Sequence, residues 1–282
     1  MRPELAEAAR LLRGGKTADL ERALELIQGT VFAFSMKVCG HPEDAEDTMQ
    51  DVLIKSLPYL RKIENPQALA VWLYKVTRNR CWMSRRRSKF APDVTLSLEE
   101  LMPDAAELAA LTAKDPVSLE GRLDQKRDAE RVRQAVLRIP PKYRLILVLH
   151  DMEELDTDEV SRITGLRPGT VRVRLHRARL FVRRELSVAE KPVGPRKRKL
   201  SKLPSCRQMF ASLSEYMDRR IDDLECGRVQ KHLADCPACL AFVNDLSRAV
   251  ERCKSLETPC GSRTAEKLRK LLMAEYQRFA EA

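Results

Sequence analysis

Aromatic side chains and long apolar runs are both scarce in this 282-residue chain. Aromatic residues make up 5 % of it against 44 % for all hydrophobic residues, so its cores should be built mainly from Leu, Val, Ile and Ala. No apolar stretch approaches the roughly 20 residues that a membrane-spanning helix needs. The first residues contain acids and lack the apolar centre of a signal peptide. We therefore expect a cytoplasmic protein with no membrane partner.

Catalytic signatures are also missing, because the sequence shows neither a nucleophile–base set nor an open metal site. We do not expect an enzyme. Charge is abundant instead: 33 % of the residues are charged, the net charge is +11 and the pI is about 9.4. Such an excess favours a polyanionic partner, and nucleic acid becomes the better candidate once a membrane is set aside. Charged residues that repeat at helical spacing predict an all-α fold.

Cysteine is unevenly distributed, because six of the eight lie between Cys206 and Cys260. Structural disulfides are rare in the cytosol, so this cluster indicates metal or redox chemistry. Cys39 and Cys81 lie in helical patterns, and we expect them to be ordinary core residues.

Residues 156–185 have a residue pattern that is typical of a helix-turn-helix. Asp156 and Glu159 are spaced as a capping box at the start of a first helix. Gly165 suits the turn, and Pro168 suits the first turn of a second helix. The second helix has an apolar stripe, made of Val171, Leu175, Ala178 and Val182.

Arginines dominate the rest of the second helix and should project toward solvent; they are Arg172, Arg174, Arg177, Arg179, Arg183 and Arg184. Arginine is the residue best suited to forked contacts with phosphate and guanine. A solvated charged face would be the ordinary explanation of a charge run. Here nearly all of the charge is positive, and a glycine turn joins two predicted helices. Together these features favour DNA binding over a merely solvated face.

Residues 139–179 resemble region 4 of the extracytoplasmic-function (ECF) sigma factors, through Pro140/Pro141, Glu159-Val160 and Gly169-Thr170-Val171. Arg172 stands where the family usually has Lys, and Ser161 stands where Ala is usual. The resemblance implies that the second helix reads the −35 promoter element in the major groove. The residues implied to bind DNA are Thr170, Arg172, Arg174, His176, Arg177 and Arg179.

An acidic helical face precedes this motif by about a hundred residues. It is formed by Asp44, Asp47, Gln50 and Asp51, while Val52, Leu53 and Leu57 face the other way. By itself this pattern is typical of a solvated helix. The segment nevertheless resembles region 2 of ECF sigma factors, which implies that these four residues bind the β′ clamp of core RNA polymerase. The β subunit is the other polymerase partner that the resemblance implies.

A basic run follows, in which aromatic and amide side chains are interleaved. Such a run suits contacts to the phosphate backbone and stacking on unpaired bases. It resembles the region 2 helix that helps to melt the −10 element, although the family usually has Asp-x-x-Arg where residues 83–86 read Met-Ser-Arg-Arg. The residues implied to bind DNA are Arg78, Asn79, Arg80, Trp82, Arg85, Arg86 and Arg87.

The tail contains Cys206 followed by His232-x3-Cys236-x2-Cys239, a Cys3His set that suits tetrahedral zinc. Buried cysteines with a surface histidine are the simpler alternative. The tail also resembles the zinc-binding anti-sigma module, which implies a small helical bundle that masks a sigma factor. Three cysteines remain outside this set: Cys226, Cys253 and Cys260. They could be spare thiols, parts of a redox switch, or ligands of another soft metal such as copper.

The predicted organisation is sigma region 2 (18–91), a linker (92–121), a region 4 helix-turn-helix (122–187), a basic linker (188–204) and a Cys/His domain (205–282). A last amphipathic helix over 265–280 is expected to dock on the sigma domains or on a partner. The resemblance implies an alternative sigma factor with a metal- or redox-sensitive tail acting in cis. Two alternatives stay open: a metal- or redox-responsive helix-turn-helix repressor, and an anti-sigma-type interaction protein.

Overall fold

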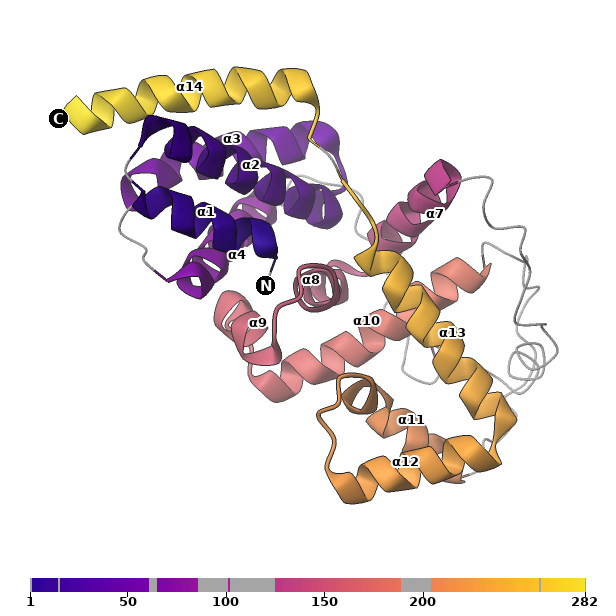
Figure 1. Cartoon of the computed structure of the whole chain (residues 1–282). Helices are drawn as coiled ribbons and strands as arrows, with labels where there is room; N and C mark the ends of the chain where they lie inside the picture. Colours follow the sequence, from indigo (N-terminus) through magenta and orange to yellow (C-terminus); the bar gives the residue numbers. More distant parts are fainter. Residues whose placement is uncertain are drawn as a thin grey trace. The chain divides into compact units, whose positions relative to one another are not determined.

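The computed structural model describes residues 2–14, 16–60, 65–85, 101, 125–188, 204–258 and 260–281. Nearly all of the two predicted linkers, 92–121 and 188–204, lies outside these ranges. Every regular element within them is helical, as the sequence predicts (Figure 1). The chain forms two compact units: residues 1–91, 148–168 and 257–282 make the first, and residues 92–147 and 169–256 make the second.

Four helices, α1 (Pro3–Arg13), α2 (Thr17–Cys39), α3 (Pro42–Leu60) and α4 (Pro66–Arg85), form the centre of the first unit. Helix α2 ends because Gly40 adopts a left-handed conformation at φ 84° and donates its N–H to the carbonyl oxygen of Met36. The buried core contains few aromatic rings and many Leu and Val side chains, as the composition predicts. The rings of Phe34 and Tyr74 meet edge to face between α2 and α4, with centroids 5.0 Å apart.

The first unit also contains a π-helical turn, η2 (Val148–Met152), and helix α9 (Thr157–Thr164). Asp156 and Glu159 form the predicted capping box at the start of α9. Gly165 ends α9 with φ 73°, which confirms the predicted turn.

Helix α14 (Ser262–Glu281) completes the first unit and packs along α2 and α3 (Figure 1). It buries Leu268 and Leu272, two members of the predicted apolar stripe. The expectation that the last helix docks on a sigma domain is therefore confirmed. The side chains of Tyr276 and Phe279, also predicted on this stripe, lie outside the described residues.

The second unit contains α7 (Gln125–Arg138), α8 (Pro141–Leu147) and α10 (Pro168–Val188). The predicted stripe of α10, Val171, Leu175, Ala178 and Val182, is completely or almost completely buried. Tyr143 of α8 stacks on Phe181 of α10 with centroids 5.5 Å apart. The apolar periodicity therefore identified the buried face of α10 correctly.

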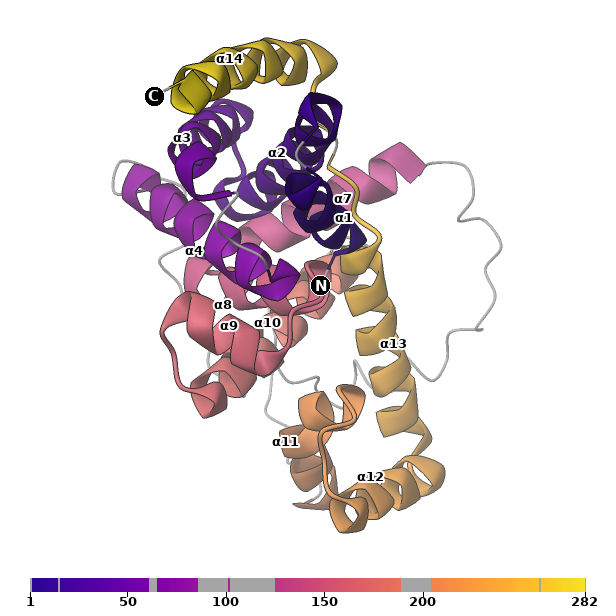
Figure 2. The same ribbon diagram turned by 60° about the vertical axis from the view of Figure 1, so that its left-hand side comes forward.

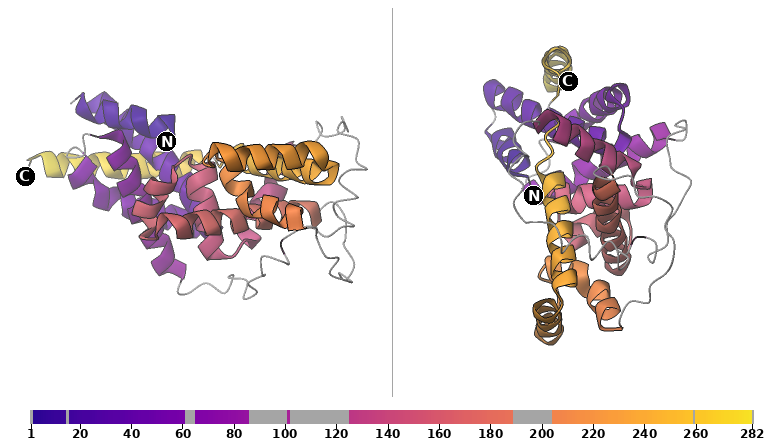
Figure 3. Two further views of the ribbon diagram at one scale, coloured as in Figure 1. Left: turned by 90° about the horizontal axis from the view of Figure 1, so that it is seen from below. Right: turned by 90° about the vertical axis from the view of Figure 1, so that its right-hand side faces the viewer.

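Three further helices of the second unit, α11 (Pro204–Met217), α12 (Asp223–Asp235) and α13 (Pro237–Lys254), lie together (Figures 2 and 3). The Asp222 carboxylate caps α12 by accepting from the N–H of Glu225 at 2.8 Å, and Pro237 begins α13. Phe210 and Phe242 join α11 to α13 with ring centroids 5.1 Å apart. We call residues 204–254 the Cys/His module.

Candidate nucleic-acid interface and metal centre

Helix α10 carries the residues expected to read DNA, and their exposure decreases along it. Thr170 and Arg172 are exposed, whereas Arg174, His176 and Arg177 are half-buried. Arg179 is only 2 % exposed, and so is Arg183 one turn further on. The expectation that the arginines of this helix project toward solvent is therefore wrong for Arg179 and Arg183.

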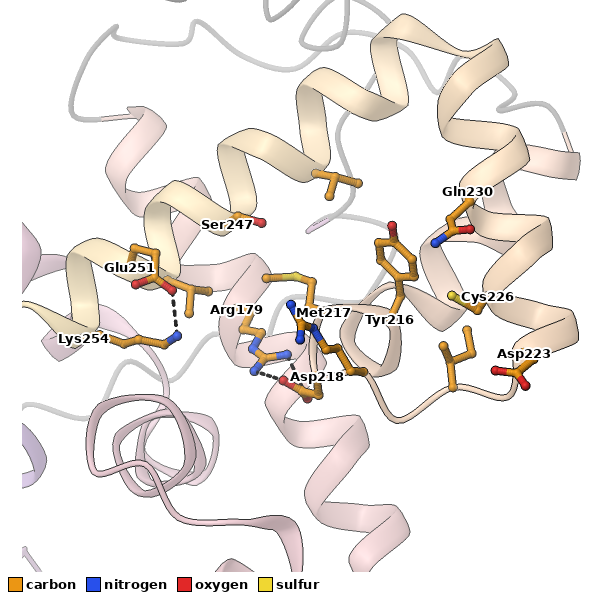
Figure 4. Close-up of a pocket in the computed structure, with 14 residues that line it drawn as sticks. Arg179, Tyr216, Met217, Asp218, Asp223, Cys226, Gln230, Ser247, Glu251 and Lys254 are labelled. Atoms are coloured by element: carbon orange, nitrogen blue, oxygen red, sulfur yellow. Dashed lines mark hydrogen bonds and ion pairs between the residues drawn. The ribbon is translucent and has the colours of Figure 1, made fainter. Parts of the chain in front are cut away.

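Acidic residues of the Cys/His module pair with these two arginines in the buried interface. Arg179 donates to both carboxylate oxygens of Asp218, at 2.6 and 3.1 Å (Figure 4). Arg183 donates to Asp245 at 2.8 Å and lies over the ring of Phe242, 4.3 Å from its centroid. These are charge-assisted contacts of the kind that arginine also makes with phosphate.

Two weaker contacts extend the same interface toward the start of α10. Arg172, which is exposed, pairs with the half-buried Glu215 at 3.2 Å. His176 Nδ1 lies 3.2 Å from the hydroxyl oxygen of Ser214. Burial, and then the charges of Arg179 and Arg177, lower the pKa of His176 to about 4. His176 is therefore neutral at neutral pH.

A cavity of about 670 Å³ lies beside the Arg179–Asp218 pair. Figure 4 shows Tyr216, Cys226 and Gln230 on one side of it and Lys254 on the other. Cys226, one of the cysteines outside the predicted metal set, therefore lines this cavity rather than the Cys3His cluster.

The acidic face of α3 is partly exposed and partly paired. Asp47 and Gln50 are exposed, and Asp44 is half-buried. Asp51 pairs with Arg80 of α4 at 2.5 Å. The structure thus joins one residue of the predicted polymerase face to one residue of the predicted −10 face.

Helix α4 contacts α9 within the first unit. Arg78 donates to the carbonyl oxygen of Ile163 at 2.8 Å, and burial lowers the pKa of Arg78. Asn79 next to it is exposed. Arg86 and Arg87, and the side chains of Trp82 and Arg85, lie outside the described residues.

A buried polar cluster around Glu153 was not expected from the sequence. The Glu153 carboxylate accepts from Lys37 at 2.8 Å and from the hydroxyl of Tyr74 at 2.7 Å, and it forms an ion pair with Arg2, whose Nε lies 2.7 Å away. Burial lowers the pKa of Lys37, and Glu153 partly offsets that shift. One signal was available: Lys37 is the lone charge in an apolar stretch of α2, where an unpaired ammonium would be costly.

The four predicted metal ligands converge on one point between α11, α12 and α13. The ligand atoms of Cys206, His232, Cys236 and Cys239 all lie within 4.8 Å of one another. Nε2 of His232 is buried and makes no hydrogen bond among the described residues. Burial and the neighbouring Cys236 and Cys206 thiols raise the pKa of Cys239, so a bound cation would be needed to hold Cys239 as a thiolate. The donor set therefore fits a metal ion, in the Cys3His combination that suits zinc.

Comparison with known proteins agrees with this geometry. The family "Sigma-70 region 2" matches residues 23–90, "Sigma-70, region 4" matches 129–182, and "Putative zinc-finger" matches 206–240. The first two matches contain the predicted polymerase and DNA residues, and the third contains all four residues of the Cys3His cluster.

Several characterised relatives cover regions 2 and 4. The ECF RNA polymerase sigma factor SigW of Bacillus subtilis is 24 % identical over 163 residues, which are 58 % of this chain and 86 % of that protein. The ECF RNA polymerase sigma factor SigE of Mycolicibacterium smegmatis is 30 % identical over 156 residues, 54 % of this chain and 56 % of that protein. RNA polymerase sigma factor YlaC of B. subtilis is 27 % identical over 147 residues, 52 % of this chain and 80 % of that protein.

Sigma factors are not enzymes; they bind core RNA polymerase and promoter DNA and direct transcription initiation. Within the described ranges, no helix combines the length and hydropathy required to cross a bilayer. A simple helix-turn-helix repressor would not contain region 2, and a free-standing anti-sigma protein would not contain regions 2 and 4. Neither alternative therefore accounts for all three matches. The chain belongs to the ECF sigma factors of the sigma-70 family, with regions 2 and 4 followed by a C-terminal zinc-finger module.

Proposed function

We propose that the Cys/His module inhibits this sigma factor in cis by binding the DNA-reading helix. The buried ion pairs of Arg179 with Asp218 and of Arg183 with Asp245 carry this proposal. An arginine held in such a pair cannot also bind a phosphate or a base. Because removing one partner of a buried pair leaves an uncompensated charge, the arginines leave the module only together with a larger opening of the interface.

The first unit supports a closed state independently. Region 2 helix α4 contacts α9 of the helix-turn-helix through Arg78 and Ile163. Glu153, in the chain just before α9, is held in the core of region 2 by Lys37 and Tyr74. The −10 and −35 elements are separated by more than one turn of DNA, about 34 Å. A region 4 helix that touches region 2 cannot read the second element while region 2 reads the first.

In the open form, the contacts implied by the family would become available. Asp44, Asp47, Gln50 and Asp51 would bind the β′ clamp of core polymerase. The basic run that begins at Arg78 would contact the −10 element, and α10 would read the −35 element from Thr170 to Arg179. Asp51 and Arg80, which pair with each other inside region 2, would exchange that ion pair for contacts with polymerase and DNA respectively.

Zinc would hold the module together in the closed state. Cys206 comes from α11, His232 from α12, and Cys236 and Cys239 from the start of α13. A bound Zn²⁺ would therefore supply a cross-link between these three helices, in addition to their apolar contacts. Loss of zinc, by thiol oxidation or by replacement with a softer metal such as copper, would loosen Asp218 and Asp245 and release α10.

Transcription by full-length protein with core polymerase tests the proposal. The double variant Asp218→Asn/Asp245→Asn should initiate more transcripts than wild type, because it removes both acids that hold α10. Asp223→Asn, which changes an exposed acid of the same module, is the matched control and should leave the activity unchanged. Equal activity of the double variant and wild type, with both proteins folded by circular dichroism, would reject inhibition by these contacts.

Binding of core polymerase is tested separately on the acidic face. Asp47→Lys should weaken capture of the full-length double variant by core polymerase, because it reverses an exposed charge on α3. Glu21→Lys makes the same change on an exposed position of α2 and should not. Equal loss in both variants would indicate a general charge effect rather than a defined polymerase surface.

A further inference from the structure

We propose that Cys39 and Cys81 form a reversible dithiol–disulfide site inside region 2, separate from the zinc module. Both residues carry thiols, and their sulfur atoms lie 2.7 Å apart. A disulfide bond measures about 2.05 Å, so a small side-chain rotation brings the two atoms to bonding distance. Cys81 is a buried core residue, as expected, whereas Cys39 is half-buried.

Helix packing holds the two sulfurs in place. Cys39 is the last residue of α2 and Cys81 lies in the last part of α4. The Phe34–Tyr74 ring contact lies one to two turns earlier in the same two helices. The pairing of the sulfurs is therefore part of a continuous seam between α2 and α4, and it does not depend on a loop.

The unequal exposure of the two cysteines indicates which thiol reacts first with an oxidant and which one then closes the disulfide. Cys39 is half-buried and can be reached by a small oxidant, whereas Cys81 is 1 % exposed. Hydrogen peroxide would oxidise Cys39 first: an S–O bond forms as the O–O bond breaks, giving a sulfenic acid and water. Cys81 sulfur then attacks that sulfur, the S–O bond breaks and a second water leaves. Two thiols and one hydrogen peroxide thus give one disulfide and two waters.

The position of the site gives the bond a structural effect. Cys81 lies within the basic run expected at the −10 element, between Arg80 and Trp82. A Cys39–Cys81 disulfide would tie this end of α4 to the end of α2, across a sequence separation of 42 residues. Region 2 would thereby acquire a covalent restraint beside its predicted DNA surface, whatever the state of the Cys/His module.

Peptide mapping of zinc-loaded full-length protein tests the site. The protein is treated with a few equivalents of hydrogen peroxide, its remaining thiols are alkylated, and it is digested with trypsin without reduction. Cleavage after Lys37 and after Arg80 places the two cysteines on separate peptides. We expect one cross-linked species, lighter than the sum of the two peptides by about 2 Da, the two thiol hydrogens, and lost on reduction.

Matched variants make the outcome decisive. Cys39→Ser should abolish the cross-link and leave Cys81 alkylated, whereas Cys226→Ser, which removes a half-buried thiol of the second unit, should leave it intact. Oxidised wild type should also melt at a higher temperature than reduced wild type, and this shift should be missing in Cys39→Ser. Separate alkylation of Cys39 and Cys81 at peroxide levels that oxidise Cys226, or pairing of Cys39 with a tail cysteine, would overturn the proposal.

Discussion

Arginines 179 and 183 of helix α10 are almost fully buried, although arginine is seldom found inside proteins without a partner. Asp218 and Asp245 supply the partners, and the ring of Phe242 covers the guanidinium of Arg183. His176 lies in the same interface and is kept neutral by burial and by the nearby arginines. At the residue scale, the closed state therefore depends on which groups carry charge.

His176 should make this interface sensitive to acid. Its pKa falls from 6.5 to about 4 in the folded protein, so the unfolded chain binds a proton more readily. The stability that follows is complete above the unfolded pKa and is lost as the pH falls from about 6.5 toward about 4. Relative to His176→Asn, wild type should lose about 2 kcal/mol of unfolding free energy between about pH 7.5 and about pH 5, at about 1.4 kcal/mol per pKa unit.

Urea unfolding of both proteins across this range provides the measurement. The zinc ligands titrate equally in the two proteins, so their effect cancels in the difference. Parallel pH profiles would show that His176 does not change its protonation on folding.

Glu153 should be the most sensitive acid of the first unit. Glu153→Gln leaves the buried Lys37 ammonium without its counter-charge, so unfolding free energy should fall by about 3–5 kcal/mol. Asp158→Asn, an exposed acid of the same unit, should change it by less than about 0.5 kcal/mol. Chemical denaturation measures both, and the double variant Lys37→Met/Glu153→Gln should recover part of the loss. Similar small losses in the two single variants would mean that Glu153 is not buried as a charged partner.

At the scale of elements, local capping rules fix the helix-turn-helix. Asp156 and Glu159 satisfy the first N–H groups of α9, and Gly165 supplies the left-handed turn that leads to Pro168. A short helix of this kind gains little stability from helix propensity alone, so the capping residues at its two ends determine where it begins and ends.

A pair of glycine substitutions tests this turn. Gly165→Ala places a side chain at φ 73° and should destabilise the first unit by about 1 kcal/mol, although its Cβ would meet no atom within 4 Å. Gly29→Ala, in the interior of α2 with equally open space, should stabilise the same unit by about 0.5–1 kcal/mol. Thermal melts should therefore shift in opposite directions. Stabilisation by both substitutions would show that Gly165 does not need its left-handed conformation.

At the scale of the whole molecule, zinc and DNA should compete through helix α10. Adding a strong chelator to wild type should increase promoter-DNA affinity, because the module that pairs with Arg179 and Arg183 loses its cross-link. Affinity should also fall more steeply with salt after chelation, since each additional phosphate that the released arginines neutralise adds about 0.9 to the slope of log K against log salt. Fluorescence anisotropy over a salt series measures both quantities.

The double variant Asp218→Asn/Asp245→Asn is the reference for this experiment, because its α10 is already released. Chelation should change its DNA affinity little. An equal increase in wild type and double variant would place the effect of zinc outside the α10 interface.

Much of this protein follows from its sequence, because the deciding signals are local. Caps, helical stripes and the His232-x3-Cys236-x2-Cys239 spacing depend on residues within a few turns of one another, so they predicted the helices, the helix-turn-helix and the clustered metal ligands. The sequence also identified the arginines of α10, but it could not show that the module buries Arg179 and Arg183. That outcome depends on acids 39 and 62 residues away.

Only the tertiary structure decided the long-range pairings. Glu153 meets Lys37 across 116 positions, and Cys39 meets Cys81 across 42, because packed helices bring their side chains together. The periodicity of a sequence does not show which two distant residues will contact each other once both are buried. The sequence alone therefore determined the kind of protein and its surfaces, whereas the structure decided which of those surfaces are covered, since burial of a charge depends on a partner that folding delivers.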